Sequence, residues 1–327
     1  MNKLYKIILK ESKLFRASYL SSILGLFGLG NIWRKAHLLW GVSKWIGEIV
    51  LLFTAFIWVL LILLFILKWI VNYKEAIYEL NHPIKNNYIG LLGVTFLLMA
   101  VIAFPYSYKI ALILFVLGGI TQFIYGIFFT ERMWLKTPKF NFITPALYLP
   151  TVAGNFVSAL VAGLFGFNTL GMLFLGIGFF SWFSLESIIM NRLKKESISN
   201  DLKPTLGIMM APPAIAGAAS ISLNLNESPF IYFLIGYALF QFLIFSRILP
   251  SLFKEQFKLS FWAFSFGVTT TTYICLKTFG NSNDVYYTYF IVAVFILANL
   301  LIFYLIVNSI FLVIRKLMNI KTTTNEK

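Results

Sequence analysis

The chain has few charged residues, cysteines and histidines. Charged side chains make up 12% of its 327 residues, hydrophobic ones make up 59%, and the mean hydropathy is +0.83. This composition excludes a globular protein that faces water on all sides. The single cysteine, Cys275, cannot form an intrachain disulfide, and two histidines without a cysteine partner are too few for a metal cluster. We therefore expect no cofactor, no metal site and no nucleic-acid partner.

Motifs of membrane-bound enzymes are absent as well. The sequence contains neither the His-Glu-x-x-His pair of zinc proteases nor the clustered acids that hold a metal for lipid-phosphate transfer. Its two histidines, His37 and His82, lie near the ends of expected helices, which also argues against a serine–histidine protease site. We do not expect an enzyme.

Long apolar runs take up most of the chain instead. The uncharged run from Ile49 to Leu67 nearly supplies the roughly 20 residues that cross a bilayer, and Trp45 and Trp69 flank it as interfacial rings. Such runs lack the alternation of a membrane barrel, so the sequence predicts an all-α integral membrane protein. Ten spans are expected, at 17–34, 45–72, 87–104, 107–130, 143–164, 168–192, 205–224, 230–251, 257–278 and 285–314.

Lysines and arginines are unevenly distributed between the two sides of this arrangement. Cytoplasmic loops carry an excess of them, and placing both termini in the cytoplasm puts 22 of the 27 on that side. Of the other five, Arg34, Lys35 and Lys44 fall in the expected first outer loop. We expect a multi-pass protein of the cell's inner (plasma) membrane, made of a basic N-terminal segment (1–16), a ten-helix domain (17–315) and a short cytoplasmic tail (316–327).

The odd-numbered spans differ in composition from the even-numbered ones. The fifth and seventh are rich in glycine, serine and proline, whereas the second, fourth, eighth and tenth are rich in phenylalanine, leucine and isoleucine. Irregular backbone at membrane depth is tolerated where protein or water, not lipid, meets it. We expect five helical hairpins, with the odd helices as an inner ring around a central pore and the even helices facing lipid. The alternative is that the small residues only allow close helix packing.

Several short strings occur in a particular order along the chain. They are Thr144-Pro145-Ala146-Leu147-Tyr148-Leu149-Pro150, Ser181-Trp182-Phe183-Ser184-Leu185-Glu186, Leu206-Gly207-Ile208 and Phe261-Trp262-Ala263-Phe264-Ser265-Phe266-Gly267. In order and spacing the chain resembles the tellurite-resistance/dicarboxylate transporter family, in particular its bacterial TehA-like branch, which is related to the slow anion channels of plant guard cells. The resemblance implies a ten-helix protomer with five inner helices around its own pore, assembled as a homotrimer.

The same resemblance implies a gate. A phenylalanine of the ninth helix blocks the pore in that family, and the matching residue here is Phe266; a ring across a narrow apolar tube excludes water and ions until it rotates. The family's usual glycine against this ring is replaced here by Ser21. The alternative is that Phe266, one of 35 phenylalanines, only packs. The candidates for lining the pore are Ser21, Gly25, Pro150, Thr151, Gly154, Pro212, Pro213 and Gly267.

The expected inner helices carry no acidic residue in mid-span, which favours anions over cations. Arg34, Lys35 and Lys44 are candidates for attracting anions at the outer mouth. The first hypothesis is therefore a gated, channel-like path for small anions such as chloride or nitrate. The alternative is a carrier for C4-dicarboxylates or tellurite-type oxyanions, which could be proton-coupled. A dicarboxylate site would need a buried arginine or lysine, and the expected inner helices carry none in mid-span. Proton coupling would need a carboxylate or histidine relay at membrane depth, and none is evident in the sequence. Both observations favour the channel.

Overall fold

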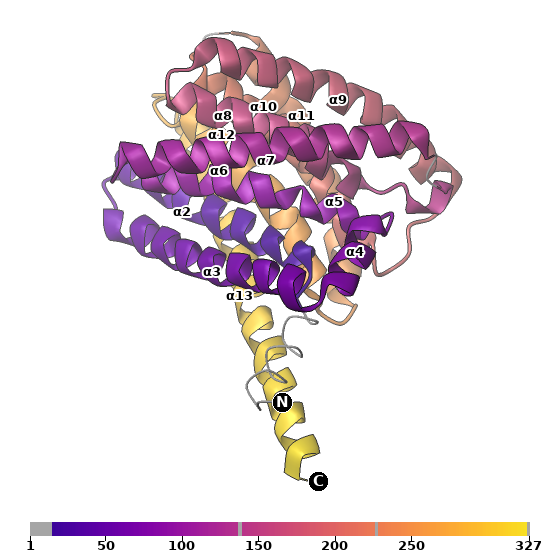
Figure 1. Ribbon diagram of the computed structural model, residues 1–327. Helices are drawn as coiled ribbons and strands as arrows, with labels where there is room; N and C mark the ends of the chain where they lie inside the picture. Colours follow the sequence, from indigo (N-terminus) through magenta and orange to yellow (C-terminus); the bar gives the residue numbers. More distant parts are fainter. Residues whose placement is uncertain (1–14, 137–138, 226–227, 326–327) are drawn as a thin grey trace.

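A computed structural model describes residues 15–136, 139–225 and 228–325, and in these residues all regular structure is helical. Figure 1 labels the α-helices. The α-helices are α2 (Ser21–Trp40), α3 (Lys44–Val71), α4 (Tyr73–Asn81), α5 (Lys85–Ile89), α6 (Leu91–Ala103), α7 (Tyr108–Leu135), α8 (Gly154–Leu164), α9 (Asn168–Lys195), α10 (Ala211–Ser222), α11 (Phe230–Phe253), α12 (Ser265–Phe279) and α13 (Val285–Asn325). Short 3-10 or π turns are η1 (Ala17–Leu20), η2 (Phe140–Phe142), η3 (Pro145–Leu147), η4 (Leu149–Ala153), η5 (Lys203–Met210) and η6 (Leu259–Phe264).

Nine helical stretches in the described part of the chain are long and apolar enough to cross a membrane. They correspond to the second to tenth predicted spans. The first predicted span, 17–34, forms η1 and the 20-residue helix α2, but polar residues in the second half of α2, among them Asn31, Arg34 and Lys35, make it less apolar than the others. More than half of α2 is buried inside the protein, so it does not need an apolar surface. Its crossing of the membrane stays a prediction.

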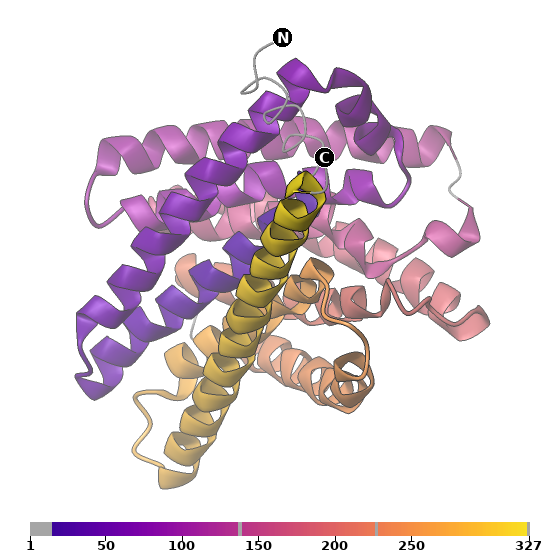
Figure 2. The same cartoon turned by 90° about the horizontal axis from the view of Figure 1, so that it is seen from below.

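The helices pack as a closed ring surrounded by partners. Contacts join α2 to α6, α6 to α8, α8 to α10, α10 to α12 and α12 back to α2. Each ring helix also contacts the helix that follows it: α2 contacts α3, α6 contacts α7, α8 contacts α9, α10 contacts α11 and α12 contacts α13. Figure 1 shows two of these pairs, α6 with α7 and α8 with α9, running side by side, and Figure 2 shows α13 crossing the face of the bundle that is seen from below.

Burial alternates along the chain in the way the composition predicts. In the most apolar stretch of each span, 72–83% of the residues are buried in the spans that contain α6, α8, α10 and α12, against 17–33% in those of α3, α7, α9, α11 and α13. Small residues let the ring helices approach one another, while the phenylalanine- and leucine-rich helices keep apolar surface for lipid. The alternation of buried and exposed spans from the second to the tenth therefore follows their residue types.

Each inner helix is preceded by a short helical segment or turn at the same end of the bundle. The segments are η1 before α2, α5 before α6, η3 and η4 before α8, η5 before α10 and η6 before α12. Prolines occupy the first turns of η3, η4, η5 and α10, where a missing backbone N–H costs least. We call the opposite end, which carries the loops 41–43, 104–107, 165–167 and 280–284, the predicted outer face.

Two of the predicted outer-loop cations lie in a helix instead. Helix α2 continues to Trp40 and ends at Gly41, whose positive φ of 67° closes the helix, so Arg34 and Lys35 are helical residues; Lys44 is the first residue of α3. Placing all three in a loop was wrong, because α2 continues past Arg34, whose charge is paired with Glu48 of α3. Residues 1–14 of the predicted N-terminal segment lie outside the described residues, and α13 continues to Asn325 into the predicted tail.

A buried ion pair fixes the start of the described chain to the end of α3. The Lys68 ammonium lies 2.6 Å from Oε2 of Glu79, and the two side chains are only 2% and 5% exposed. The second oxygen of Glu79 accepts from the backbone N–H of Ala17 at 3.0 Å, and Lys68 also donates to the carbonyl of Phe15 at 3.2 Å. This cluster joins η1, α3 and α4 with its hydrogen-bonding groups paired.

The contact between α2 and α12 depends on two glycines. A Cβ atom on Gly28 would lie 1.9 Å from Oγ1 and 2.5 Å from Cβ of Thr269, and one on Gly25 would lie 2.2 Å from Oγ of Ser265. The two helix backbones can approach this closely only because neither glycine has a side chain.

We expect Gly28→Ala to lower the stability of the protein by about 1–3 kcal/mol, because Thr269 must move to admit the methyl group. The apparent melting temperature in detergent measures the effect. The matched control is Gly119→Ala in α7, where nothing lies within 4 Å of the added Cβ and the greater helix propensity of alanine is expected to be neutral or stabilising. Equal melting temperatures for the two variants would contradict the close packing of α2 on α12.

Candidate functional site

A small cavity of about 50 Å³ lies at the centre of the inner ring. All five inner helices contribute to its wall. The lining residues are Phe27, Gly28 and Asn31 of α2, Val101 of α6, Leu160 of α8, Ile215 and Ala218 of α10, and Phe266, Thr269, Thr270 and Tyr273 of α12. The ring therefore surrounds space that a small solute or water can occupy.

Phe266 lies in the first half of the span Leu259–Phe279, at the start of α12, and is the first of the four lining residues along that helix. The others, Thr269, Thr270 and Tyr273, follow it towards the predicted outer face. Only 4% of Phe266 is exposed, and Phe27 of α2 lines the same cavity at 7%. Phe266 is thus the deepest lining residue of α12, and its ring borders the cavity.

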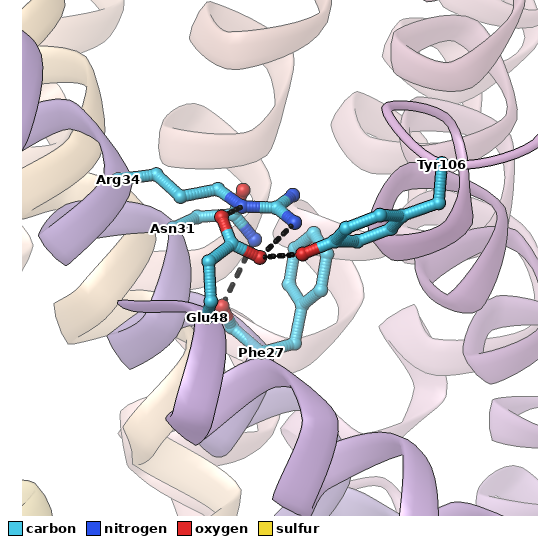
Figure 3. A network of polar contacts seen from close by, with 5 residues as sticks. All are labelled: Phe27, Asn31, Arg34, Glu48 and Tyr106. Carbon is cyan, nitrogen blue, oxygen red and sulfur yellow. Dashed lines mark hydrogen bonds and ion pairs between the residues drawn. The ribbon is translucent and has the colours of Figure 1, made fainter. Parts of the chain in front are cut away.

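Polar groups of α2 and α12 reach this space. The side-chain N–H of Asn31 donates to the carbonyl of Phe27 at 3.0 Å, as Figure 3 shows. Thr269 donates to the carbonyl of Ser265 at 3.0 Å, whereas the Thr270 and Tyr273 hydroxyls have no hydrogen-bond partner in the described part of the chain. The lining set contains no acidic and no basic side chain.

The eight predicted pore-lining residues lie elsewhere in the inner ring and do not belong to the lining set of this cavity. Ser21 donates to the carbonyl of Ser18 at 2.6 Å, about two turns before Phe27 and Gly28 on the same helix. Gly25 packs on Ser265 and Trp262, and Gly267 packs on Met210 of η5. Pro212 and Pro213 are buried in the first turn of α10. Their role in a pore stays a prediction.

Three of those candidates, Pro150, Thr151 and Gly154, face helix α7. Gln122 of α7 donates to the carbonyl of Pro150, and a Cβ atom on Gly154 would overlap the Gln122 side chain. Thr151 lines a groove between α7 and α9. In this conformation these residues join an inner helix to its outer neighbour.

The predicted outer mouth carries a network that joins α2 and α3 to the loop 104–107 (Figure 3). The guanidinium of Arg34 donates to both carboxylate oxygens of Glu48 in α3, at 2.7 and 2.8 Å, and the Tyr106 hydroxyl donates to the same carboxylate. Accepting this bond, Glu48 raises the pKa of Tyr106, so the phenol stays protonated. The charge of Arg34 is therefore balanced by Glu48.

Two lysines of the same face have no such acid. Lys35 of α2 is partly exposed and lies within electrostatic reach of Lys277 near the end of α12. No ion pair joins either of them, or Lys44, to an acid in the described residues. Lys44 instead lies 5.4 Å from the centre of the Trp45 ring. The uncompensated positive charge at this face comes from these lysines rather than from Arg34.

Glu186 of α9 accepts from three donors: Trp182 one turn earlier on the same helix, Tyr148 between η3 and η4, and Tyr237 of α11. It accepts from the Tyr148 hydroxyl, from Nε1 of Trp182 at 2.9 Å and from the Tyr237 hydroxyl at 3.0 Å. Its carboxylate binds protein groups and joins α9 to α11 and to the start of the fifth span.

The sequence contains one signal for the polar lining of the cavity that motif reasoning missed. Four consecutive threonines, 269–272, lie inside a buried helix. A run of hydroxyl groups is unusual at membrane depth and suggests a polar function for the face that carries it.

Comparisons with known proteins identify the family of this chain. The sequence model of the voltage-dependent anion channel family matches residues 14–310. Over 271 residues the chain is 27% identical to the tellurite resistance protein TehA homolog of Haemophilus influenzae, which covers 82% of this chain and 83% of that protein. It is 23% identical to an uncharacterized transporter of Methanocaldococcus jannaschii (82% and 86% covered) and 25% identical to the S-type anion channel SLAH2 of Arabidopsis thaliana (74% and 45% covered). Since the family match spans most of the chain, the protein belongs to the voltage-dependent anion channel family.

Proposed function

We propose that the protein is a gated channel that passes small anions, such as chloride or nitrate, through the centre of the inner ring, and that Phe266 is its gate. One observation carries the proposal: the central cavity is lined by all five inner helices and bordered on α12 by the Phe266 ring. An aromatic ring in an apolar constriction keeps water out, and an ion cannot cross without its hydration. Rotation of the ring would open the path.

The chemistry of the cavity wall supports anions. A cation path is usually lined by carboxylates or carbonyl groups, and no carboxylate lines this cavity. Its polar side chains include hydroxyl and amide donors, which bind anions. The relatives named as an anion channel and as a tellurite resistance protein homolog fit a path for anions.

The cavity is small for an organic substrate. Pockets that bind drug-sized ligands span roughly 300–1,000 Å³, against about 50 Å³ here. No arginine or lysine lines it to pair with the carboxylates of a C4-dicarboxylate. These features favour a channel over a carrier for C4-dicarboxylates or tellurite-type oxyanions.

Uptake into proteoliposomes distinguishes these functions. We expect vesicles with the Phe266→Ala variant to take up labelled chloride much faster than empty vesicles and to take up labelled succinate at the rate of empty vesicles. Succinate uptake by the wild-type protein that depends on a proton gradient would replace the channel with a coupled carrier.

The proposal includes ten membrane crossings with both termini in the cytoplasm and assembly as a homotrimer with one pore per protomer. The closed ring of α2, α6, α8, α10 and α12 supports a separate path in each protomer. Labelling of single cysteines introduced in the loops 41–43 and 280–284 tests the orientation, and native mass spectrometry tests the trimer.

The two unpaired lysines of the outer mouth are expected to concentrate anions. In the Phe266→Ala background, we expect Lys35→Gln with Lys277→Gln to lower the chloride current about twofold at low salt, because less positive potential reaches the pore. The effect should vanish at about 1 M salt, where the Debye length is about 3 Å. Lys109→Gln, on the exposed side of α7, is the control. An equal loss in the control, or a loss that persists at high salt, would exclude this role.

A further inference from the structure

We propose that the hydroxyls of Thr270 and Tyr273 form a binding site for one monovalent anion in the central cavity, between the Phe266 ring and the predicted outer face. The proposal deepens the proposed function, on which its place in an anion path rests.

The four threonines of α12 differ in how their hydroxyls are used. Thr269, Thr271 and Thr272 donate to backbone carbonyls one turn earlier, those of Ser265, Gly267 and Val268, at 3.0, 2.7 and 3.0 Å. Thr270 is the exception in this run: its hydroxyl has no partner in the described part of the chain, although the residue is only 6% exposed. A hydroxyl that lines a cavity and has no protein partner is free to donate to a water molecule or a solute held there.

Tyr273 provides a second free hydroxyl on the same face. Phe266, Thr270 and Tyr273 are spaced four and three residues apart, so they project from one side of the helix, and all three line the cavity. The Tyr273 hydroxyl also has no hydrogen-bond partner in the described residues. Across the cavity, Asn31 uses one side-chain N–H for the carbonyl of Phe27, which leaves its second N–H available (Figure 3).

These donors suit a small anion of single charge. Hydroxyl and amide N–H groups donate to an anion and replace part of its hydration shell. No lining side chain has a full positive charge. A divalent anion would therefore lose more hydration free energy on entering the cavity than these neutral donors can replace. A volume of about 50 Å³ holds a few water molecules or one halide. The Phe266 ring lies one turn from Thr270, which places the bound anion directly beside the gate.

Anomalous diffraction from crystals of the full chain in sodium bromide tests the site directly. We expect a bromide peak within hydrogen-bond distance of the Thr270 and Tyr273 hydroxyls in the wild-type protein. Thr270→Val removes the hydroxyl at nearly constant shape, and we expect it to weaken bromide binding about tenfold, as for the loss of one charge-assisted hydrogen bond. Tyr273→Phe is expected to act in the same direction.

The matched control is Thr272→Val, which makes the same chemical change two residues further along α12, where the hydroxyl donates to the carbonyl of Val268. It should keep the bromide peak. The proposed site would be rejected if the wild-type cavity held only water. It would also be rejected if bromide occupied the cavity equally in Thr270→Val and Thr272→Val.

The outcome is separable from that of the proposed function. Bromide bound at Thr270 in a protein whose Phe266→Ala variant does not conduct would support the site and reject the channel. A conducting Phe266→Ala variant without bound bromide would support the channel and reject the site. In a conducting variant, we further expect Thr270→Val, but not Thr272→Val, to raise the chloride concentration of half-maximal current about tenfold.

Discussion

Replacing Phe266 with alanine is expected to raise the chloride conductance of the reconstituted protein about a hundredfold, which corresponds to a barrier lower by about 2.7 kcal/mol. The ring borders the cavity at its deepest point on α12 and is almost fully buried. Removing it leaves space that water can fill, and an ion that keeps its water crosses at a lower cost. Single-channel recordings in planar bilayers measure the change.

A size series separates a gate from a general disturbance. We expect the conductance to increase in the order Phe266, Phe266→Leu, Phe266→Ala, because the open cross-section grows as the side chain shrinks. Phe303→Ala, at an exposed position of α13 that faces the predicted lipid, is the control and should stay as silent as the wild type. Equal currents for Phe266→Ala and Phe303→Ala would show that Phe266 is not the gate.

Breaking the buried pair of Lys68 and Glu79 is expected to be the most destabilising single change outside the inner ring. Glu79→Gln leaves the Lys68 ammonium buried without its counter-charge, which typically costs about 3–5 kcal/mol. The two groups lie 2.6 Å apart, and Glu79 also accepts from the backbone N–H of Ala17. We expect a large drop in the apparent melting temperature in detergent.

The chain offers an exposed pair as the matched control. Lys258 and Asp201 also form an ion pair, but their side chains are 50% and 77% exposed. Exposed pairs contribute about 0–1 kcal/mol, so Asp201→Asn should barely change the melting temperature. If Glu79→Gln is as mild as Asp201→Asn, the Lys68 cluster does not fix the start of the chain as described.

Residue types predicted which spans are buried and which are exposed, because the two kinds of helix have different surroundings. Glycine and proline mark the buried spans of α8 and α10, and phenylalanine and leucine mark the exposed spans of α3 and α7. Helix lengths were less predictable. Helix α2 extends six residues past the predicted end at position 34, because Arg34 pairs with Glu48 of the next helix. The charge of Arg34 suggested that the span ends there, but Glu48 of α3 balances this charge and the helix continues to Trp40.

Contacts between helices explain what the sequence could not predict at the site. The string around Phe266 located one lining residue of the cavity, but the small residues chosen with it pack against neighbouring helices. Proline and glycine identify the inner helices, but they do not indicate which face of each helix lines the cavity. Among four adjacent threonines, only the three-dimensional hydrogen bonds single out Thr270.

The reversal potential of the Phe266→Ala variant in a planar bilayer tests the central claim most directly. With unequal potassium chloride concentrations on the two sides, an anion path lined by neutral donors predicts a current that reverses near the chloride equilibrium potential, while the wild-type protein stays almost silent. A current that reverses near the potassium potential, or no current from the variant, would contradict an anion path closed by Phe266.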